Sequence, residues 1–205
     1  MGVHKVCSMN ITKPLKTETD QILIQLAQSG NNDAIAEIVK RYQNKVYTTI
    51  FYLVKDKYIA EDLFQDTFIK VMNHIRGNKY VEQGKLGSWI VRIAHNLCID
   101  YFRKAKQQAK IVDSNGEDIF SYMLFSEENA EKKMIKQENS NKVQMLIEQL
   151  PESQKEVLLL RIYGELSFKE IAQITGVSIN TALGRMRYAL NNIKKQIEEK
   201  KMALR

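Results

Sequence analysis

The sequence predicts an all-α protein made of two small helical domains joined by a linker, with a helix-turn-helix in the second domain. Apolar residues recur at helical spacing along most of the chain, and no run of alternating apolar and polar residues indicates a strand. Only two prolines and nine glycines punctuate the 205 residues, fewer than strands and their turns usually need. Apolar residues make up 44% of the chain, which is enough for a packed core.

The first domain is expected to span residues 18–108, after a loose tail at residues 1–17. Its helices are predicted at residues 18–29, 32–54, 57–76 and 86–106. Thr17 or Thr19 is a candidate N-cap for the first of these helices, and the Asn-Asn-Asp run at 31–33 can cap the second.

The third predicted helix has two faces of different character. The apolar face, which we expect in the core, carries Phe64, Phe68, Val71 and Ile75. The opposite face carries Asp62, Leu63, Asp66 and Lys70. An exposed leucine between carboxylates is either an ordinary surface residue or part of a surface that binds a partner. The spacing alone favours the former.

The fourth predicted helix has a buried stripe formed by Ile90, Ile93, Ala94, Leu97 and Tyr101. Its opposite face carries Arg92, His95, Asn96, Arg103 and Lys106. Such a face is usually solvated surface, but the near absence of acidic residues also fits contact with nucleic acid. In the preceding loop, beside Asn78, Tyr80 is a candidate for stacking on an unpaired base, whereas Trp89 is more typical of a core.

Charge divides the chain into blocks. Basic residues dominate residues 89–110 and 181–205, and acidic residues dominate residues 112–140. We therefore interpret residues 109–135 as an acidic linker and residues 136–205 as the second domain. The whole chain has a formal net charge of +7, which favours a polyanionic partner.

The second domain contains the pattern of two helices joined by a tight turn. Ile171, Ala172 and Ile174 mark the inner face of the first helix. Gly176 provides the backbone freedom that a sharp helix exit needs, and Ser178 is a suitable N-cap for the second helix. This pattern is typical of a helix-turn-helix, whose second helix enters the major groove of DNA.

The second helix of this motif also has two faces. The residues expected to pack inward are Ile179, Ala182, Met186, Ala189 and Ile193. Those expected to face DNA are Asn180, Gly184, Arg187, Tyr188 and Asn191, flanked by Thr181, Leu183 and Arg185. Glycine inside a helix costs about 1 kcal/mol relative to alanine. Gly184 therefore either allows close approach to the duplex or is simply tolerated at the surface, and both interpretations stay open.

The residues that often carry chemistry are scattered. His4, His74 and His95 form no HExxH or acid–His–Ser arrangement, and no phosphate-binding glycine motif is present. Cys7 and Cys98 form no CxxC pair, so both are expected to be reduced thiols of a cytoplasmic protein. We predict no enzyme activity, no cofactor and no metal site. Neither a signal peptide nor an apolar stretch of membrane-spanning length is recognised.

Four stretches, in order, resemble the bacterial RNA polymerase sigma factors of the small extracytoplasmic-function (ECF) type. Ala34–Tyr47 resembles the opening of the family's promoter-melting domain, and Ala60–Phe68 resembles its core-polymerase-binding helix. Gly87–Arg103, with a W-x-x-x-I-A-x-N spacing that begins at Trp89, resembles the helix that reads the minus-ten element. Leu150–Arg161 resembles the approach to the helix-turn-helix that reads the minus-thirty-five element.

The resemblance implies a transcription initiation factor that binds core RNA polymerase, directs it to promoter DNA and helps to melt the promoter. An anti-sigma factor is implied as a further partner. The residues implied in binding core polymerase are Asp62, Leu63, Gln65 and Asp66. Those implied near the minus-ten element are Asn78, Tyr80, Arg92, Asn96 and Arg103. Those implied at the minus-thirty-five element are Asn180, Thr181, Leu183, Gly184, Arg185, Arg187 and Tyr188.

The recognition helix departs from the pattern that is frequent in the family. The differing positions are Ala182, Gly184, Tyr188 and Leu190. The target sequence is therefore not transferable to this chain. The alternative interpretation is a free-standing helix-turn-helix transcriptional regulator, which explains the second domain but neither the acidic face at Asp62 nor the helix that begins near Trp89.

Overall fold

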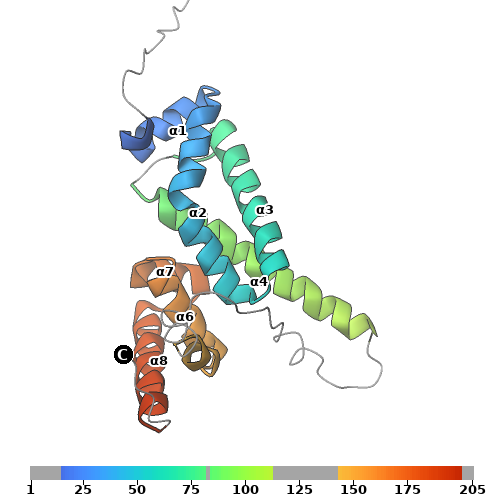
Figure 1. The fold of residues 1–205 in the computed structure, drawn as a ribbon, viewed down its shortest axis with the longest axis vertical. Coiled ribbons are helices and arrows are strands. Elements are labelled where there is room, and N and C mark those ends of the chain that lie inside the picture. The colour runs from blue at the N-terminus through green and yellow to red at the C-terminus, as the bar shows by residue number, and fades with distance from the viewer. Residues whose placement is uncertain (1–14, 82–83, 113–142, 200–205) are drawn as a thin grey trace, which may run out of the picture.

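The computed structural model describes residues 15–81, 84–112 and 143–199, and within these ranges all regular structure is helical, as predicted. The elements are η1 (Leu15–Thr17), α1 (Asp20–Gln28), α2 (Asn32–Val54), α3 (Lys57–Arg76), α4 (Leu86–Val112), α6 (Glu152–Ile162), α7 (Phe168–Thr175) and α8 (Ile179–Glu199). Residues 143–148 are also helical. Helices α1 to α4 form one group, and α6 to α8 form a second group beneath it (Figure 1).

The starts of the first helices follow from their capping residues. The side chains of Thr19 and Asn31 accept hydrogen bonds from the backbone amide three residues later, at 3.4 and 3.0 Å, which confirms two predicted caps. Asp56 caps α3 in the same way at 2.9 Å. Each bond satisfies an amide that the first helical turn leaves without an internal partner. Helix α4 continues to Val112, beyond its predicted end at residue 106.

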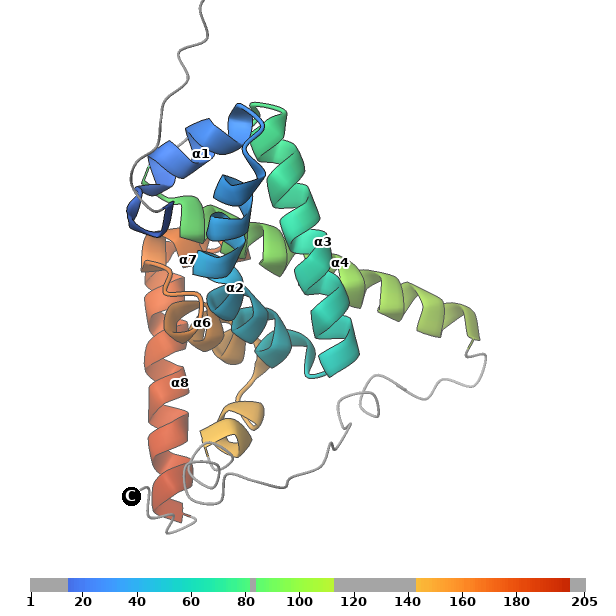
Figure 2. The same ribbon diagram turned by 45° about the horizontal axis from the view of Figure 1, so that its top comes forward.

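The first domain encloses one core, to which all four of its helices contribute. The largest side chains that are fully buried there are Leu23, Ile38, Ile50, Ile75, Leu86 and Ile90. Helix α4 crosses α2 and α3, as the two views in Figures 1 and 2 show. This crossing places one face of α4 in the core and leaves its other sides free for further contacts.

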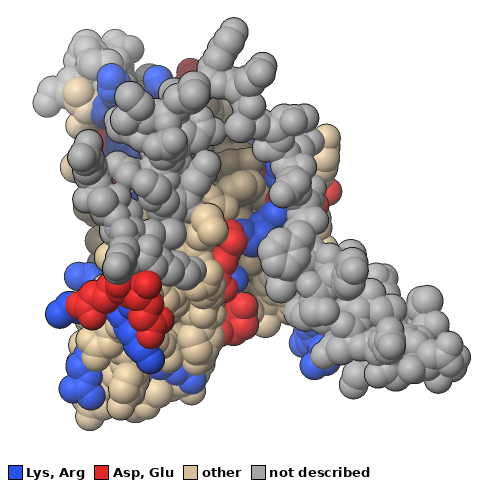
Figure 3. Space-filling model, turned by 60° about the horizontal axis from the view of Figure 1, so that its bottom comes forward, with Lys and Arg blue, Asp and Glu red and all other residues tan. Residues whose placement is uncertain are grey.

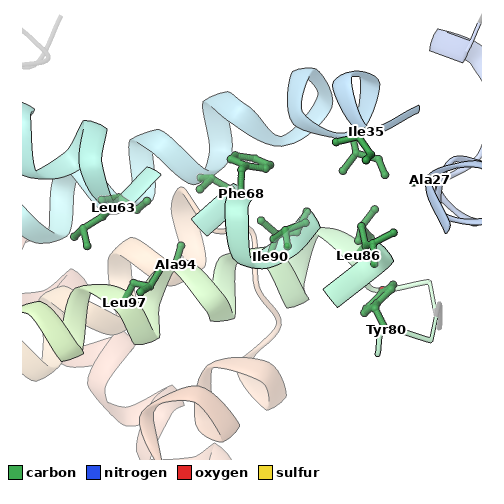
Figure 4. Packing of buried hydrophobic residues seen from close by; sticks show 14 of the residues in the cluster. Ala27, Ile35, Leu63, Phe68, Tyr80, Leu86, Ile90, Ala94 and Leu97 are labelled. Carbon is green, nitrogen blue, oxygen red and sulfur yellow. The ribbon is translucent and has the colours of Figure 1, made fainter. Parts of the chain in front are cut away.

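The expectation that Leu63 is exposed on α3 is wrong. Only 8% of the residue is accessible, and its side chain belongs to the first core together with Phe68, as Figure 4 shows. Helix α3 packs against both α2 and α4, so its buried arc is wider than the stripe through Phe68, Val71 and Ile75. Two packing partners bury residues that a single-face helical pattern assigns to solvent.

The expectation that Tyr80 is free to stack on a base is also wrong. Its accessibility is 7%, and its ring lies 4.2 Å from that of Trp89, centroid to centroid. The side-chain amide of Gln28 donates a hydrogen bond to the carbonyl of Tyr80 at 3.4 Å. Tyr80 therefore fixes the loop between α3 and α4 to the core. Trp89 is half-buried and packs against the same core, in line with the interpretation of Trp89 as a core residue.

The second domain contains the predicted helix-turn-helix in α7 and α8. Ser167 and Glu170 form a capping box at the start of α7. Gly176 ends α7 with a φ of 67°, a left-handed conformation that glycine adopts without steric cost. Ser178 Oγ accepts a hydrogen bond from the amide of Thr181 at 3.0 Å, which confirms Ser178 as the predicted cap of α8.

The inner side of α8 is close to the predicted one. Ala182 and Ala189 are fully buried, and Met186 and Ile193 are partly buried against the cores formed with α6 and α7. Ile179, which was expected to pack inward, is instead 45% exposed. It is the first residue of α8, directly after the turn, where α7 does not cover it.

Two predicted boundaries differ from the structure. Leu15–Thr17, expected in the loose tail, form the 3₁₀ turn η1, and Leu15 packs against the first core. Residues 109–112, expected in the linker, continue α4. The remaining residues of that tail, and residues 113–135 of the linker, lie outside the described ranges. Within those ranges, no helix is long and apolar enough to cross a bilayer, and no group of His, Cys, Asp and Glu is arranged to hold a metal ion.

Candidate nucleic-acid and polymerase interfaces

The outward side of α8 brings most of the predicted minus-thirty-five residues together. The exposed members are Asn180, Thr181, Leu183, Arg187 and Tyr188, whereas Gly184 and Arg185 are half-buried. The guanidinium of Arg187 lies 5.6 Å from the ring centroid of Tyr188. Such a contact restrains both side chains on the surface. Helix α8 therefore presents donors, acceptors and positive charge along one continuous stripe, and its opposite side is anchored by Ala182 and Ala189.

Nothing in the packing around Gly184 requires glycine at this position. A Cβ atom added at this position meets no other atom within 4 Å, and the residue does not have a positive φ. The packing of the chain would therefore accept alanine here. What the missing side chain provides is free space beside the helix backbone, on the side where a duplex is expected.

The predicted minus-ten residues of α4 form a second exposed stripe. Arg92, Asn96 and Arg103 are all exposed, and Asn78 is exposed at the end of α3 with a φ of 52°. Arg103 forms an ion pair with Asp100 at 3.0 Å, within the same helix. Tyr80 is only 7% exposed and packs in the first core, although it also lines the cleft beside Lys79 and Arg92.

His95 was expected on the same outward face of α4 but is only 3% exposed. Its Nε2 atom lies 2.9 Å from Oε1 of Glu156, which belongs to α6 of the second domain. The physical reason is that the side of α4 next to the Arg92 stripe is covered by α6 and α7. Sequence reasoning treated the two domains separately and had no signal for this contact.

The outer face of α3 carries the exposed residues Asp62, Gln65 and Asp66. Ile69, four residues after Gln65 and three after Asp66, is 50% exposed on the same face, and sequence reasoning missed it. In the part of the chain that the structure describes, no ion pair involves Asp62 or Asp66. This face thus combines those two carboxylates with the exposed Lys70 and an apolar side chain, a composition suited to a protein partner.

A cleft of about 480 Å³ separates the start of α4 from α7. Its cationic side chains, Lys79, Lys85 and Arg92, belong to the first domain. Glu170, Gln173 and Ile174 of α7 form the opposite wall. The cleft is therefore a positively charged surface of the first domain that faces one carboxylate of the second domain.

The C-terminal end of α8 differs in charge from its N-terminal end. Lys194 and Lys195 each lie near a glutamate one turn later, Glu198 and Glu199, at 3.9 and 3.7 Å. Figure 3 shows Lys and Arg side chains next to Asp and Glu side chains on one face of the molecule. Exposed pairs of this kind contribute little to stability, and they neutralise the positive charge locally. The strongest uncompensated charge on α8 is therefore at Arg185 and Arg187, in the stripe.

The fold and these surfaces define a class of protein. A capped helix-turn-helix with an outward polar stripe, together with a separate helical domain that carries a basic stripe and an acidic face, is the arrangement of a two-domain, DNA-binding transcription factor.

Comparison with known families identifies which kind of transcription factor this chain is. The Sigma-70 region 2 model matches residues 38–108, and the Sigma-70 region 4 model matches residues 140–190. The ECF RNA polymerase sigma factor SigM of Bacillus subtilis is 33% identical over 144 residues, which cover 70% of this chain and 83% of SigM. SigW of the same organism is 29% identical over 180 residues, which cover 86% of this chain and 95% of SigW. The chain belongs to the ECF sigma factor family, and it is a transcription initiation factor.

Solved structures show the same fold. CnrH, in its complex with the cytosolic domain of CnrY, superposes with a TM-score of 0.60 and 20% identity over 89% of this chain and 99% of CnrH. The sigma factor RpoE of Bartonella quintana, in complex with the anti-sigma factor NepR, gives a TM-score of 0.60 and 19% identity over 78% of this chain and 94% of RpoE.

Proposed function

We propose that this sigma factor uses three separate surfaces: the outer face of α3 for core RNA polymerase, the α4 stripe for the minus-ten element and the α8 stripe for the minus-thirty-five element. The two domains at residues 18–108 and 136–205 carry these surfaces. Held at a fixed separation on polymerase, two modest DNA contacts give specificity that neither has alone. The protein positions and opens DNA and performs no chemistry itself, so it requires no cofactor.

The minus-thirty-five role of α8 is supported by the exposure of Asn180, Thr181, Arg187 and Tyr188. Asn and Arg side chains pair with base edges in the major groove, and Thr and Arg also reach phosphates. Leu183, 44% exposed in the same stripe, is placed to contact apolar groups such as the methyl of thymine. The free space at Gly184 admits the duplex close to the helix backbone, and Arg185 lies at the edge of this surface.

The minus-ten role of α4 is supported by the exposure of Arg92, Asn96, Arg103 and the nearby Asn78. Arg92 lies next to Lys79 and Lys85 in the cleft, so positive charge is concentrated at the start of α4. This position suits contact with the backbone of a partly melted strand. Tyr80 contributes by holding the loop in place rather than by contacting a base.

The polymerase role of α3 is supported by Asp62, Gln65 and Asp66, which are exposed on one face with Ile69 beside them. Leu63 supports this face from the core side, because its side chain is buried. We further propose an anti-sigma factor as a partner. The sigma factors CnrH and RpoE, which share this fold, were both solved in complexes, RpoE with the anti-sigma factor NepR.

The observation that supports this proposal most strongly is the presence of the first domain. A free-standing helix-turn-helix regulator needs only the second domain, whereas residues 38–108 match Sigma-70 region 2 and present the acidic face of α3. This favours a sigma factor over the alternative regulator.

The test is co-elution of the full chain with core RNA polymerase on a size-exclusion column. We expect Asp66→Arg to abolish co-elution at submicromolar concentration, because it reverses charge at an exposed position without affecting the core. The matched control is Glu198→Arg, which makes the same charge change on α8 at a position 67% exposed and outside the three surfaces. Unchanged co-elution of Asp66→Arg would refute the assignment of α3.

A further inference from the structure

An isoleucine lies in the middle of the otherwise polar stripe that runs along α4. Before Arg103, the exposed residues of α4 are Arg92, Asn96 and Ile99, and the other residues are buried or half-buried. Their spacing of four, three and four residues places these four side chains on one face of the helix. Ile99 is 45% exposed, whereas the preceding Cys98 is fully buried. The side chain of Ile99 therefore belongs to the proposed minus-ten surface, and sequence reasoning missed it.

Ile99 has no packing role within the part of the chain that the structure describes. It belongs to none of the three clusters of buried residues, nor to the partly buried residues that pack against them. A single exposed apolar residue is ordinary on a protein surface. What distinguishes Ile99 is its position, one turn after Asn96 and one turn before Arg103, on a face expected to meet DNA.

The charges that follow Ile99 attract a polyanion. Arg103, Lys104 and Lys106 are all exposed. Asp100 is the one acidic residue of α4, and its carboxylate accepts a hydrogen bond from the guanidinium of Arg103 at 3.0 Å. The surroundings of Ile99 are therefore positively charged on balance, which suits contact with nucleic acid.

The length of the stripe matches a short run of nucleotides. Arg92 and Arg103 are 11 residues apart, which corresponds to about 16 Å along the helix at about 1.5 Å per residue. Nucleotides follow each other along one strand of a duplex at about 3.4 Å, so the stripe spans about five of them. When the two arginines contact phosphates, Asn96 and Ile99 between them face the bases.

The chemistry of isoleucine restricts what Ile99 recognises on a base. Its side chain forms no hydrogen bond, so a phosphate or polar base edge packed against it would lose water without gaining a partner. Among the four bases, thymine alone presents an apolar group in the major groove, its 5-methyl. A β-branched side chain in a helix has one strongly preferred rotamer, so the ordering of Ile99 in such a contact costs little entropy.

We propose that Ile99 is a specificity-determining residue of the minus-ten surface and that it contacts the 5-methyl group of a thymine in the promoter. The inference rests on the proposed function of α4 and adds a base preference to it. Asn96, one turn away, supplies the hydrogen-bonding group for a neighbouring base edge. Burial of one methyl group corresponds to about fourfold in affinity.

The test is a cycle of two changes, one in the protein and one in the DNA. Transcription by wild-type holoenzyme first identifies a promoter through its mapped start site. Each thymine of its minus-ten element, on either strand, is then replaced singly by deoxyuridine, which removes only the 5-methyl group. Holoenzymes that contain the wild-type chain or Ile99→Ala are titrated against each fluorescent promoter fragment.

For one thymine, we expect deoxyuridine to weaken binding by wild-type holoenzyme about fourfold and to leave binding by the Ile99→Ala holoenzyme unchanged. Ile99 lies outside the buried clusters, and alanine is the better helix former, so the variant keeps its fold. The matched control is Ile162→Ala at the end of α6, where the isoleucine is 51% exposed and outside the three proposed surfaces. This control should respond to deoxyuridine as the wild type does.

An equal effect of deoxyuridine on wild type and Ile99→Ala at every thymine, including no effect on either, would overturn the thymine contact. Arg92→Ala and Arg103→Ala, measured on the same fragments, separate this result from a failure of the proposed function. Weaker binding by both arginine variants would then leave the role of α4 intact and remove only the contact of Ile99. Unchanged binding by both would instead refute the role of α4 on which the inference rests.

Discussion

Replacement of Leu63 by alanine tests whether this residue packs in the core or contacts core polymerase at the surface. Only 8% of Leu63 is accessible, and the residue lies in the first core beside α2 and α4. Removing three buried carbon atoms costs about 2.4 kcal/mol at about 0.8 kcal/mol for each. The cavity that remains adds to this, so we expect a loss of about 2–5 kcal/mol in the free energy of unfolding.

Urea denaturation followed by fluorescence measures this loss. The chain has a single tryptophan, Trp89, which packs in the first domain, so its emission reports on the domain that contains Leu63. The control is Leu183→Ala on α8, where the leucine is 44% exposed and the change should stay within about 0.5 kcal/mol. An unchanged free energy of unfolding for Leu63→Ala, accompanied by lost binding to core polymerase, would show that Leu63 is a surface contact after all.

Four further predictions concern DNA and the buried thiol. Arg187→Ala should weaken binding of the upstream promoter element by about 1–3 kcal/mol; equal transcription from the cognate promoter would argue against a base contact. Asn96→Ala should reduce permanganate reactivity of the melted promoter more than it reduces formation of the closed complex, and wild-type reactivity would contradict this. Burial raises the pKa of Cys98 from 9.0 to about 12. In a Cys7→Ser background, iodoacetamide at pH 8 should therefore label Cys98 only after unfolding. Rapid labelling of folded protein would refute the burial of this thiol. Because the folded state holds the thiol proton more tightly, the stability that Cys98 contributes should be present below pH 9 and lost between about pH 9 and 12; a free energy of unfolding that falls no more over this range than in Cys98→Ala would contradict this.

Local signals in the sequence were sufficient for helices α1 to α3, for the start of α4 and for the helix-turn-helix of α7 and α8. A cap such as Asn31 or Ser178 acts within three residues, and Gly176 adopts its left-handed conformation for reasons internal to the turn. The same holds for the exposed stripe of α8. When only one side of a helix is covered, the spacing of its apolar residues marks that side, and the remaining residues are exposed. These elements depend on interactions between near neighbours in the chain, and such interactions are readable from residue order.

The burial of Leu63, Tyr80 and His95 was not readable in this way. Leu63 is covered because α3 lies between two helices, Tyr80 because its loop folds back onto Trp89, and His95 because the second domain closes over α4. In each case the covering group is distant in sequence, and a single helical period does not report how many sides of a helix are occupied. Residue order therefore predicted most of the helices, the helical nature of both domains and the family, whereas long-range packing determined which of the candidate residues remain on the surface for a partner to reach.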